Sequence, residues 1–255
     1  MTLAILQARM SSSRLPGKVL KLINGKPMIY WQINRILRAT KISKIVVATS
    51  TDISDDQLVN YLKFLNIPFT RGSLKNVKER FDEVLRNFPS DIFVRLTADC
   101  PLVMPKLIDQ MITYFNDNSE LDYLSNTIVP TFPDGLDIEI VQTRAFLSLN
   151  QTRLSQIEQE HVTYGLYARQ GKFNVMNYNY EKDLSEMRWT VDYEQDLAFI
   201  RRVYDNFKGN EFDFSLEDVL DFLLSNPKIK SSIDPSRRNE TLKKIIARNI
   251  EPNND

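Results

Sequence analysis

Short apolar runs alternate with longer amphipathic stretches over the first two-thirds of this chain. The runs at 3–6, 44–48, 67–70 and 91–96 are rich in Ile, Val and Phe, which favours strands. The stretches at 27–39, 54–65, 74–88 and 106–115 carry apolar residues at helical spacing. Strands that alternate with helices in this way predict βαβ units with right-handed crossovers. We therefore expect an α/β fold in which helices sandwich a mostly parallel sheet.

The last third of the chain is expected to be more mixed. Strands are predicted at 122–125, 137–141 and 173–177, with a further strand-like apolar run at 187–191. Helices are predicted at 157–169, 193–207 and 216–224, the last with Ser215 as its N-cap. A basic amphipathic helix is expected at 234–248, with a solvated face as its ordinary role and membrane contact as the alternative.

The composition excludes several classes of protein. The 255 residues include 33 basic and 33 acidic side chains, so binding driven by overall attraction to nucleic acid is not expected. No apolar run is long enough to span a membrane, and the apolar start reads as a buried strand rather than a signal peptide. One cysteine, Cys100, and one histidine, His161, exclude a disulfide or a multi-histidine metal centre within one chain. We expect a cytoplasmic enzyme or binding protein.

The loop after the first expected strand, residues 6–18, is the most informative segment. Three cations (Arg9, Arg14 and Lys18) and several serines follow the carboxyl end of that strand, where open α/β sheets bind ligands. Guanidinium, ammonium and hydroxyl groups together suit a polyphosphate. Neither glycine-rich phosphate-binding motif, G-x-x-x-x-G-K-[ST] or G-x-G-x-x-G, is present, so side chains would have to bind the phosphate groups. The alternative is a polar surface loop whose charges face water.

The run Gln-Ala-Arg-Met-Ser-Ser-Ser-Arg-Leu-Pro-Gly-Lys at 7–18 resembles the signature of cytidylyltransferases related to CMP-3-deoxy-manno-octulosonate synthetase, above all the spore-coat polysaccharide (SpsF-like) branch. Further matching elements lie at 71–81, 95–102, 132–139, 158–163 and 188–197, so the resemblance covers roughly residues 3–205. The Met-Ser-Ser-Ser of the first loop departs from the Gly-Gly-Ser-Lys type of the sialic and pseudaminic acid enzymes, which argues against sialic acid as the substrate.

The resemblance implies a Rossmann-like nucleotidyltransferase domain over 1–208, with an acceptor or dimerisation segment at about 122–180, and a helical extension over 209–255. It implies that Arg9, Arg14, Lys18 and Asp99 are catalytic and that Asp99 and Asp192 bind Mg²⁺. The alternative for either aspartate is a helix cap or a turn. The implied nucleotide-binding residues are Leu6, Gln7, Ala8, Arg9, Ser12, Ser13, Arg14, Lys18, Arg71, Ser73, Arg80, Thr97 and Ala98.

The implied acceptor-binding residues are Asp137, Glu139, Glu160, His161 and Arg188. Asp137 and Glu139 alternate on one expected strand and would share a face, which could bind sugar hydroxyls or a second metal, or face solvent. His161, inside an expected helix, could equally be structural, and Arg188 could form a surface salt bridge instead of pairing with an acidic acceptor group. Cys100 is expected to be buried and inert.

The function implied is transfer of CMP from CTP to an acidic sugar or related acid, with pyrophosphate released, in surface-polysaccharide synthesis. The partners implied are CTP, an acidic small molecule and a second copy of the chain in a homodimer. Two alternatives stay open. A nucleotide-sugar glycosyltransferase would usually carry an Asp-X-Asp motif, which this chain lacks. The second alternative is a protein that keeps the fold and binds a nucleotide but has lost catalytic turnover.

Overall fold

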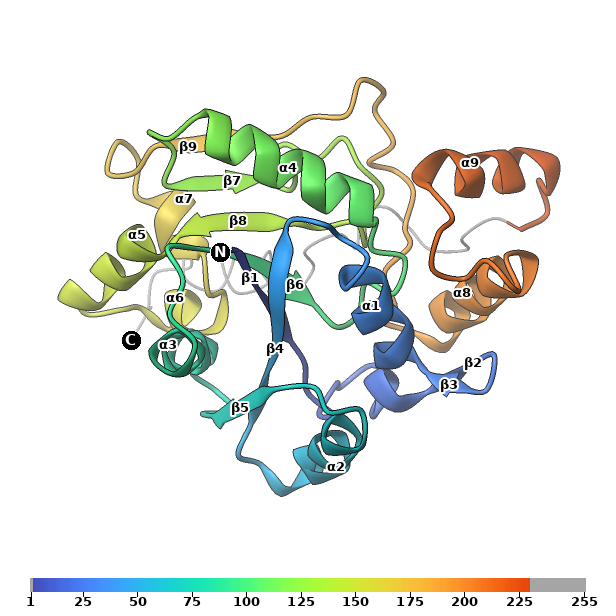
Figure 1. Cartoon of the computed structure of the whole chain (residues 1–255), viewed down its shortest axis with the longest axis horizontal. Coiled ribbons are helices and arrows are strands. Elements are labelled where there is room, and N and C mark those ends of the chain that lie inside the picture. The colour runs from blue at the N-terminus through green and yellow to red at the C-terminus, as the bar shows by residue number, and fades with distance from the viewer. Residues whose placement is uncertain (1, 230–255) are drawn as a thin grey trace, which may run out of the picture.

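A seven-stranded sheet forms the centre of the molecule, in a computed structural model that describes residues 2–229. The strands lie in the order β5-β4-β1-β6-β8-β7-β9 (Figure 1). Only β8 runs against its neighbours, so the expected mostly parallel sheet is confirmed. The bounds are β1 (Thr2–Gln7), β4 (Ile42–Ser50), β5 (Phe69–Gly72), β6 (Ile92–Thr97), β7 (Tyr123–Ser125), β8 (Glu139–Gln142) and β9 (Val175–Asn177).

Helices cover both faces of this sheet. They are α1 (Met28–Ile36), α2 (Asp56–Phe64), α3 (Val77–Asn87), α4 (Pro105–Asp117), α5 (Thr143–Ser148), α6 (Gln156–Glu160), α7 (Tyr164–Ala168), α8 (Glu194–Asn206) and α9 (Leu216–Ser225). A small antiparallel ribbon, β2 (Leu22–Ile23) with β3 (Lys26–Pro27), leads into α1.

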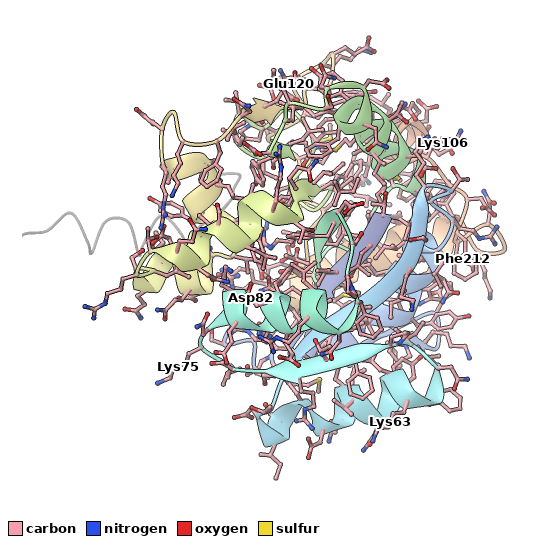
Figure 2. The ribbon with its side chains drawn as sticks, turned by 60° about the vertical axis from the view of Figure 1, so that its left-hand side comes forward. Lys63, Lys75, Asp82, Lys106, Glu120 and Phe212 are labelled. Atoms are coloured by element: carbon pink, nitrogen blue, oxygen red, sulfur yellow. The ribbon has the colours of Figure 1, made fainter. Side chains whose placement is uncertain are left out.

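The alternation of side chains along β1 divides the interior into two cores. Ala4 and Leu6 pack into one core, with apolar residues of α1, α2, α4 and α8. Leu3 and Ile5 pack into the other, with residues of α3, α5 and α7. Figure 2 shows α2, which carries the labelled Lys63, and α3, which carries the labelled Asp82, on either side of β5. A strand buried on both faces needs a nearly continuous apolar sequence, as β1 has.

Most expected elements are found, with small shifts at their ends. Ser215 caps α9 and exchanges hydrogen bonds with Asp218, as expected from their spacing. The prediction of one continuous helix at 157–169 is wrong. The backbone leaves the helical region at His161, so this segment forms two shorter helices, α6 and α7. Pro27, at the end of β3, precedes α1 as its N-cap residue, whereas Pro105 is the first residue of α4.

The strand expected at 187–191 does not form. The segment makes one isolated bridge, between Asp134 and Arg188, and its backbone bonds go to loops instead. Val191 donates its N–H to the carbonyl oxygen of Asp99 at 2.8 Å, and Trp189 donates to that of Asp134 at 2.6 Å. The segment therefore crosses the carboxyl end of β6, which brings Asp192 to Asp99.

The carboxyl-terminal extension is described only in part. Helix α9 falls in the expected region, but the basic helix predicted at 234–248 lies outside the described residues. Within residues 2–229, no helix is both long and apolar enough to cross a membrane.

Candidate active site

The loop after β1 is held in a compact shape at the carboxyl edge of the sheet. Ser12 and Gly17 both donate their N–H groups to the carbonyl oxygen of Met10, at 2.9 Å each. The N–H of Met10 in turn donates to the buried carboxylate of Asp55 at 2.6 Å. Gly17 has a φ of 68°, a left-handed conformation that suits glycine, and it leads into the short 3-10 turn that begins at Lys18. The loop is thus anchored rather than free.

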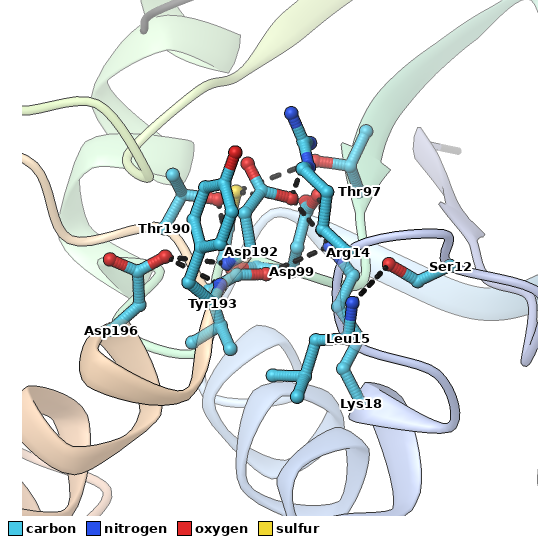
Figure 3. Close-up of polar contacts among 12 residues, drawn as sticks. Ser12, Arg14, Leu15, Lys18, Thr97, Asp99, Thr190, Asp192, Tyr193 and Asp196 are labelled. Atoms are coloured by element: carbon cyan, nitrogen blue, oxygen red, sulfur yellow. Dashed lines mark hydrogen bonds and ion pairs between the residues drawn. The ribbon is translucent and has the colours of Figure 1, made fainter.

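Lys18 lies between Asp99 and Asp192, the two aspartates for which the family resemblance implies metal binding (Figure 3). Its Nζ lies 3.0 Å from Asp99 Oδ2 and 2.9 Å from Asp192 Oδ1, and it also donates to the carbonyl oxygen of Val191 at 2.8 Å. Arg14 Nη2 reaches the same oxygen of Asp192 at 2.7 Å. Folding therefore brings together Arg14, Lys18, Asp99 and Asp192.

The contacts within this cluster shift the pKa values of Lys18 and Asp99. Burial alone would lower the pKa of Lys18, but the charges of Asp99 and Asp192 outweigh burial and raise it. Burial alone would raise the pKa of Asp99, but Lys18 and a hydrogen bond from Thr97 hold it well below its usual range. At neutral pH Lys18 is therefore an ammonium group and Asp99 an ionised carboxylate.

A cavity of about 860 Å³ opens beside this cluster and extends across the carboxyl ends of β1 and β6 to β8 and β7. Most of the predicted site residues line it: Gln7, Ala8, Arg9, Ser12, Ser13, Arg14, Lys18, Thr97, Ala98, Asp99, Asp137, Glu139, Glu160, His161, Arg188 and Asp192. Its volume is in the range of small-molecule and cofactor sites. Leu6 is buried within β1 and contributes no wall.

Three predicted nucleotide-binding residues lie outside the cavity walls, beside β5. Arg71 donates to the carbonyl oxygens of Ser50 and Asp52 and pairs with Asp56, and the Ser73 hydroxyl accepts the N–H of Asn76. Arg80 is fully buried, and none of its three guanidinium nitrogens has a hydrogen-bond partner among residues 2–229. Burial, together with the nearby charge of Arg9, lowers the pKa of Arg80 to about 10. The part of these residues in nucleotide binding stays a prediction.

The far side of the cavity has a floor built around Glu139. Arg95 on β6 forms an ion pair with Glu139 on the adjacent β8 and donates to the Gln7 side chain at 3.1 Å. Tyr123 donates its hydroxyl to Glu139 at 2.9 Å, and Thr163 donates a second. Sequence analysis predicted Glu139 as a site residue, but it did not predict that Arg95, Tyr123 and Thr163 would contact its carboxylate. The four residues come from separate segments of the chain.

Arg188, predicted to bind an acidic group of the acceptor or else to form a salt bridge, forms buried ion pairs with the protein's own carboxylates, and its part in acceptor binding stays a prediction. Its guanidinium is 3% exposed, pairs with Asp134, and donates to Asp192 Oδ2 at 2.6 Å. Gly135 makes this possible, because a Cβ there would lie 2.5 Å from the backbone nitrogen of Thr190. The role of Arg188 in the structure is to hold the carboxylates of Asp134 and Asp192 in place.

The remaining expectations concern single residues. Asp192 is not a helix cap, since Asp196 instead accepts the N–H groups of Asp192 and Tyr193 at the start of α8. Cys100 is buried, and burial beside Asp99 raises its thiol pKa, so it is inert as expected. His161 lines the cavity between α6 and α7, where burial and then Arg95 lower its pKa.

Comparison with known proteins places this fold and site in a family. A family model described as Cytidylyltransferase matches residues 3–217. The chain belongs to the cytidylyltransferase family. It is therefore a CTP-dependent nucleotidyltransferase, as the first-loop motif predicts.

Individual relatives agree with this assignment. The spore coat polysaccharide biosynthesis protein SpsF of Bacillus subtilis is 29% identical over 233 residues, 88% of this chain and 95% of that protein. A 3-deoxy-manno-octulosonate cytidylyltransferase of Geotalea daltonii is 32% identical over 146 residues, 51% of this chain and 56% of that protein. The structure of a cytidylyltransferase from Leptospira borgpetersenii superposes with a TM-score of 0.86 at 29% identity, over 91% of this chain and 97% of the other.

Proposed function

We propose that this cytidylyltransferase moves CMP from CTP to an oxygen of a small acceptor and releases pyrophosphate. The observation that carries the proposal is the convergence of Arg14, Lys18, Asp99 and Asp192 beside a large cavity at the carboxyl edge of the sheet. Attack at the α-phosphorus builds negative charge on the phosphoryl group and the leaving pyrophosphate. Fixed cations that face this charge accelerate such a reaction by positioning and electrostatic stabilisation, with no covalent intermediate.

The cationic residues of the first loop are proposed to hold the triphosphate. Arg9 lines the cavity, and Arg14 and Lys18 point into the same region as Asp192. Gln7 and Ala8 line the wall at the end of β1, where their backbone can contact the cytosine. Arg80 lies near Arg9, and its guanidinium nitrogens have no hydrogen-bond partner in the part of the chain that the structure describes, which supports a place for Arg80 beside the bound nucleotide.

Asp99 and Asp192 fit a magnesium ion. Their oxygens converge on one cation, the ammonium group of Lys18, so they already share a position for positive charge. Within residues 2–229 no cluster of three or more His, Cys, Asp or Glu side chains is arranged to hold a metal. Magnesium commonly takes one or two carboxylates and completes its shell with substrate phosphate and water, so two aspartates suffice. The ion would neutralise phosphate charge and orient the triphosphate.

The relatives support a place in surface-polysaccharide synthesis and an acidic acceptor. SpsF is named for spore coat polysaccharide biosynthesis, and the Geotalea protein is named for an acidic sugar. A carboxylate beside the attacking oxygen would lie near the position between Asp99 and Asp192, where a bound Mg²⁺ would supply positive charge. A homodimer and a cytoplasmic location remain part of the proposal, on the sequence resemblance.

Pyrophosphate release tests this function directly. The chain is incubated with CTP, Mg²⁺ and a panel of acidic sugars, with ATP, GTP and UTP as competing nucleotides. Asp99→Ala and Lys18→Ala are each expected to reduce turnover by about 10²-fold or more, the size of single electrostatic contributions to catalysis. Asp221→Asn, a change on the exposed face of α9, is the control and should leave turnover unchanged. Near-normal turnover in both site variants would remove Asp99 and Lys18 from the mechanism.

A further inference from the structure

Asp55 is a buried acidic residue that the proposed mechanism does not use. It ends the short 3-10 turn Ile53–Asp55, between β4 and α2, and its side chain is fully buried. It forms no ion pair within the described part of the chain, although Arg80 lies nearby. A buried carboxylate without a counter-ion needs hydrogen-bond donors around it. The donors that surround Asp55 therefore indicate what it does.

The two oxygens of this carboxylate serve different segments of the chain. Oδ2 accepts three hydrogen bonds from the end of β4: from the N–H of Ser50 at 3.0 Å, from the hydroxyl of Thr49 at 3.0 Å and from the hydroxyl of Ser50. Oδ1 accepts the N–H of Met10 at 2.6 Å. Met10 lies 45 positions away along the chain, in the loop after β1. Asp55 therefore fastens the first loop to the end of β4.

Met10 is also the centre of the hydrogen bonds within the first loop. Its carbonyl oxygen accepts the N–H groups of Ser12 and Gly17, so the shape of the loop is built on this one residue. Arg9 precedes Met10, Ser12 and Ser13 follow it, and all three line the cavity. A displacement of Met10 would therefore move several of the groups that are proposed to hold the triphosphate.

From this arrangement we infer that Asp55 is a positioning residue for the proposed reaction, because it holds the nucleotide-free loop in the shape that receives the triphosphate. The inference rests on the proposed function and adds a residue that does not line the cavity. Without the bond to Met10 the loop would occupy other shapes, and CTP would bind only the fraction of molecules that keeps the right one. The apparent affinity for CTP then falls by that fraction, while the turnover of the saturated enzyme is retained.

Asp55→Asn should release the loop, because an amide has only one accepting oxygen. The N–H groups of Met10 and Ser50 would compete for this oxygen, and the other N–H would face the amide's own NH2 group. The bond from Ser50 is buried, whereas the bond from Met10 is only partly buried, so the N–H of Met10 can turn to water at a lower cost. The oxygen is therefore expected to stay with Ser50.

Kinetics and proteolysis test the inference. In pyrophosphate release, Asp55→Asn should raise KM for CTP by about 10-fold or more, the cost of one buried hydrogen bond, and should leave kcat nearly unchanged. In the nucleotide-free protein, trypsin should cut the variant faster than the wild type after Arg9, Arg14 or Lys18, because cleavage needs a locally opened loop. A wild type without pyrophosphate release counts against the proposed function, and the cleavage rates still decide the inference. Equal cleavage rates overturn it.

Ser50→Ala is the matched control. It removes one hydrogen bond to the same carboxylate and leaves the bond between Asp55 and Met10 in place. The variant should lose stability, but its KM for CTP and its rate of cleavage in the loop should stay at the wild-type values. An unchanged KM in Asp55→Asn, or an equal rise in Ser50→Ala, would show that Asp55 only stabilises the fold and would overturn the inference.

A second variant carries the test if Asp55→Asn does not fold. Met10 is replaced by its α-hydroxy acid analogue through cell-free translation, so that an ester oxygen takes the place of the N–H and every side chain is kept. KM for CTP should rise as in Asp55→Asn, with kcat retained. A wild-type KM in this ester variant overturns the inference.

Discussion

The two ends of the cavity handle charge in opposite ways. At the end beside the first loop, called the nucleotide end, Lys18 lies between two carboxylates that the proposed reaction needs for a metal ion, and Arg9 forms no ion pair with the described residues. At the far end, around Glu139 and called the acceptor end, the guanidinium groups of Arg95 and Arg188 are committed to carboxylates of the protein. The difference teaches that a count of charged residues does not reveal which charges a ligand can use. Availability depends on the partners that folding supplies.

The largest stability effect should come from breaking the neutralisation at the acceptor end. Glu139→Gln keeps the shape of the side chain but leaves the buried Arg95 without its counter-charge. Breaking a buried ion pair on one side costs about 3 kcal/mol or more in the free energy of unfolding. Thermal or urea unfolding of the purified variant measures this cost.

The matched control is a pair on the surface. Glu83 and Arg86 form an ion pair on exposed turns of α3, and Glu83→Gln should change stability by less than about 1 kcal/mol. If Glu139→Gln lowered the free energy of unfolding no more than Glu83→Gln, Arg95 would not need Glu139 as its counter-charge. The two ends of the cavity would then not differ as described.

Much of the fold could be predicted because it depends on local patterns. The apolar runs at β1 and β6 and the capped helix α9 follow from short stretches of sequence. The approach of Asp99 to Asp192 does not, because it depends on a segment that crosses the sheet edge through backbone bonds to the Asp99 and Asp134 carbonyls. Only the family resemblance indicated that these two aspartates would meet.

The site residues that sequence analysis missed share one property. Asp55, which anchors the first loop, and Arg95, which neutralises Glu139, act through partners distant in the chain. Asp55 follows β4 in a short polar stretch that resembles any helix start. Arg95 begins the matching element at 95–102, but the sequence analysis assigned it no binding or structural role. The partner of each residue is set by the folded chain, so the motif at 95–102 could mark Arg95 but could not show that it pairs with Glu139.

Replacing Lys18 should strengthen metal binding, and the expected change in free energy is smaller than the stability lost in Glu139→Gln. Lys18→Met removes an ammonium group that occupies the position between Asp99 and Asp192. Because the lysine competes with a metal for the same oxygens, its removal should tighten Mn²⁺ binding to the nucleotide-free protein by about 10-fold, or 1.4 kcal/mol. Titration of Mn²⁺ followed by electron paramagnetic resonance measures the affinity without turnover.

Lys21→Met provides the comparison for this experiment. Lys21 pairs with Glu194 at 3.2 Å on the surface, so its loss removes the same charge away from the two aspartates. It should leave Mn²⁺ affinity nearly unchanged. Equal affinities for the wild type and Lys18→Met would show that Lys18 does not compete with the metal for these carboxylates.

The smallest expected effect is a change in how the free energy of unfolding depends on pH, and it comes from His161. The pKa of His161 is lowered in the folded chain by burial and then by Arg95. In the unfolded chain its pKa is about 6.5. As pH falls below that value, the unfolded state takes up a proton before the folded state does, so the free energy of unfolding decreases until the folded histidine also titrates. His161→Gln removes this titration, and the stability of the variant should therefore fall less than that of the wild type between pH 7.5 and pH 5.5 in urea unfolding.

Carboxylates elsewhere titrate in both proteins and cancel in the difference. Identical slopes would mean that the imidazole is solvated and charged on acidification, and the acceptor end would then gain a cation at low pH.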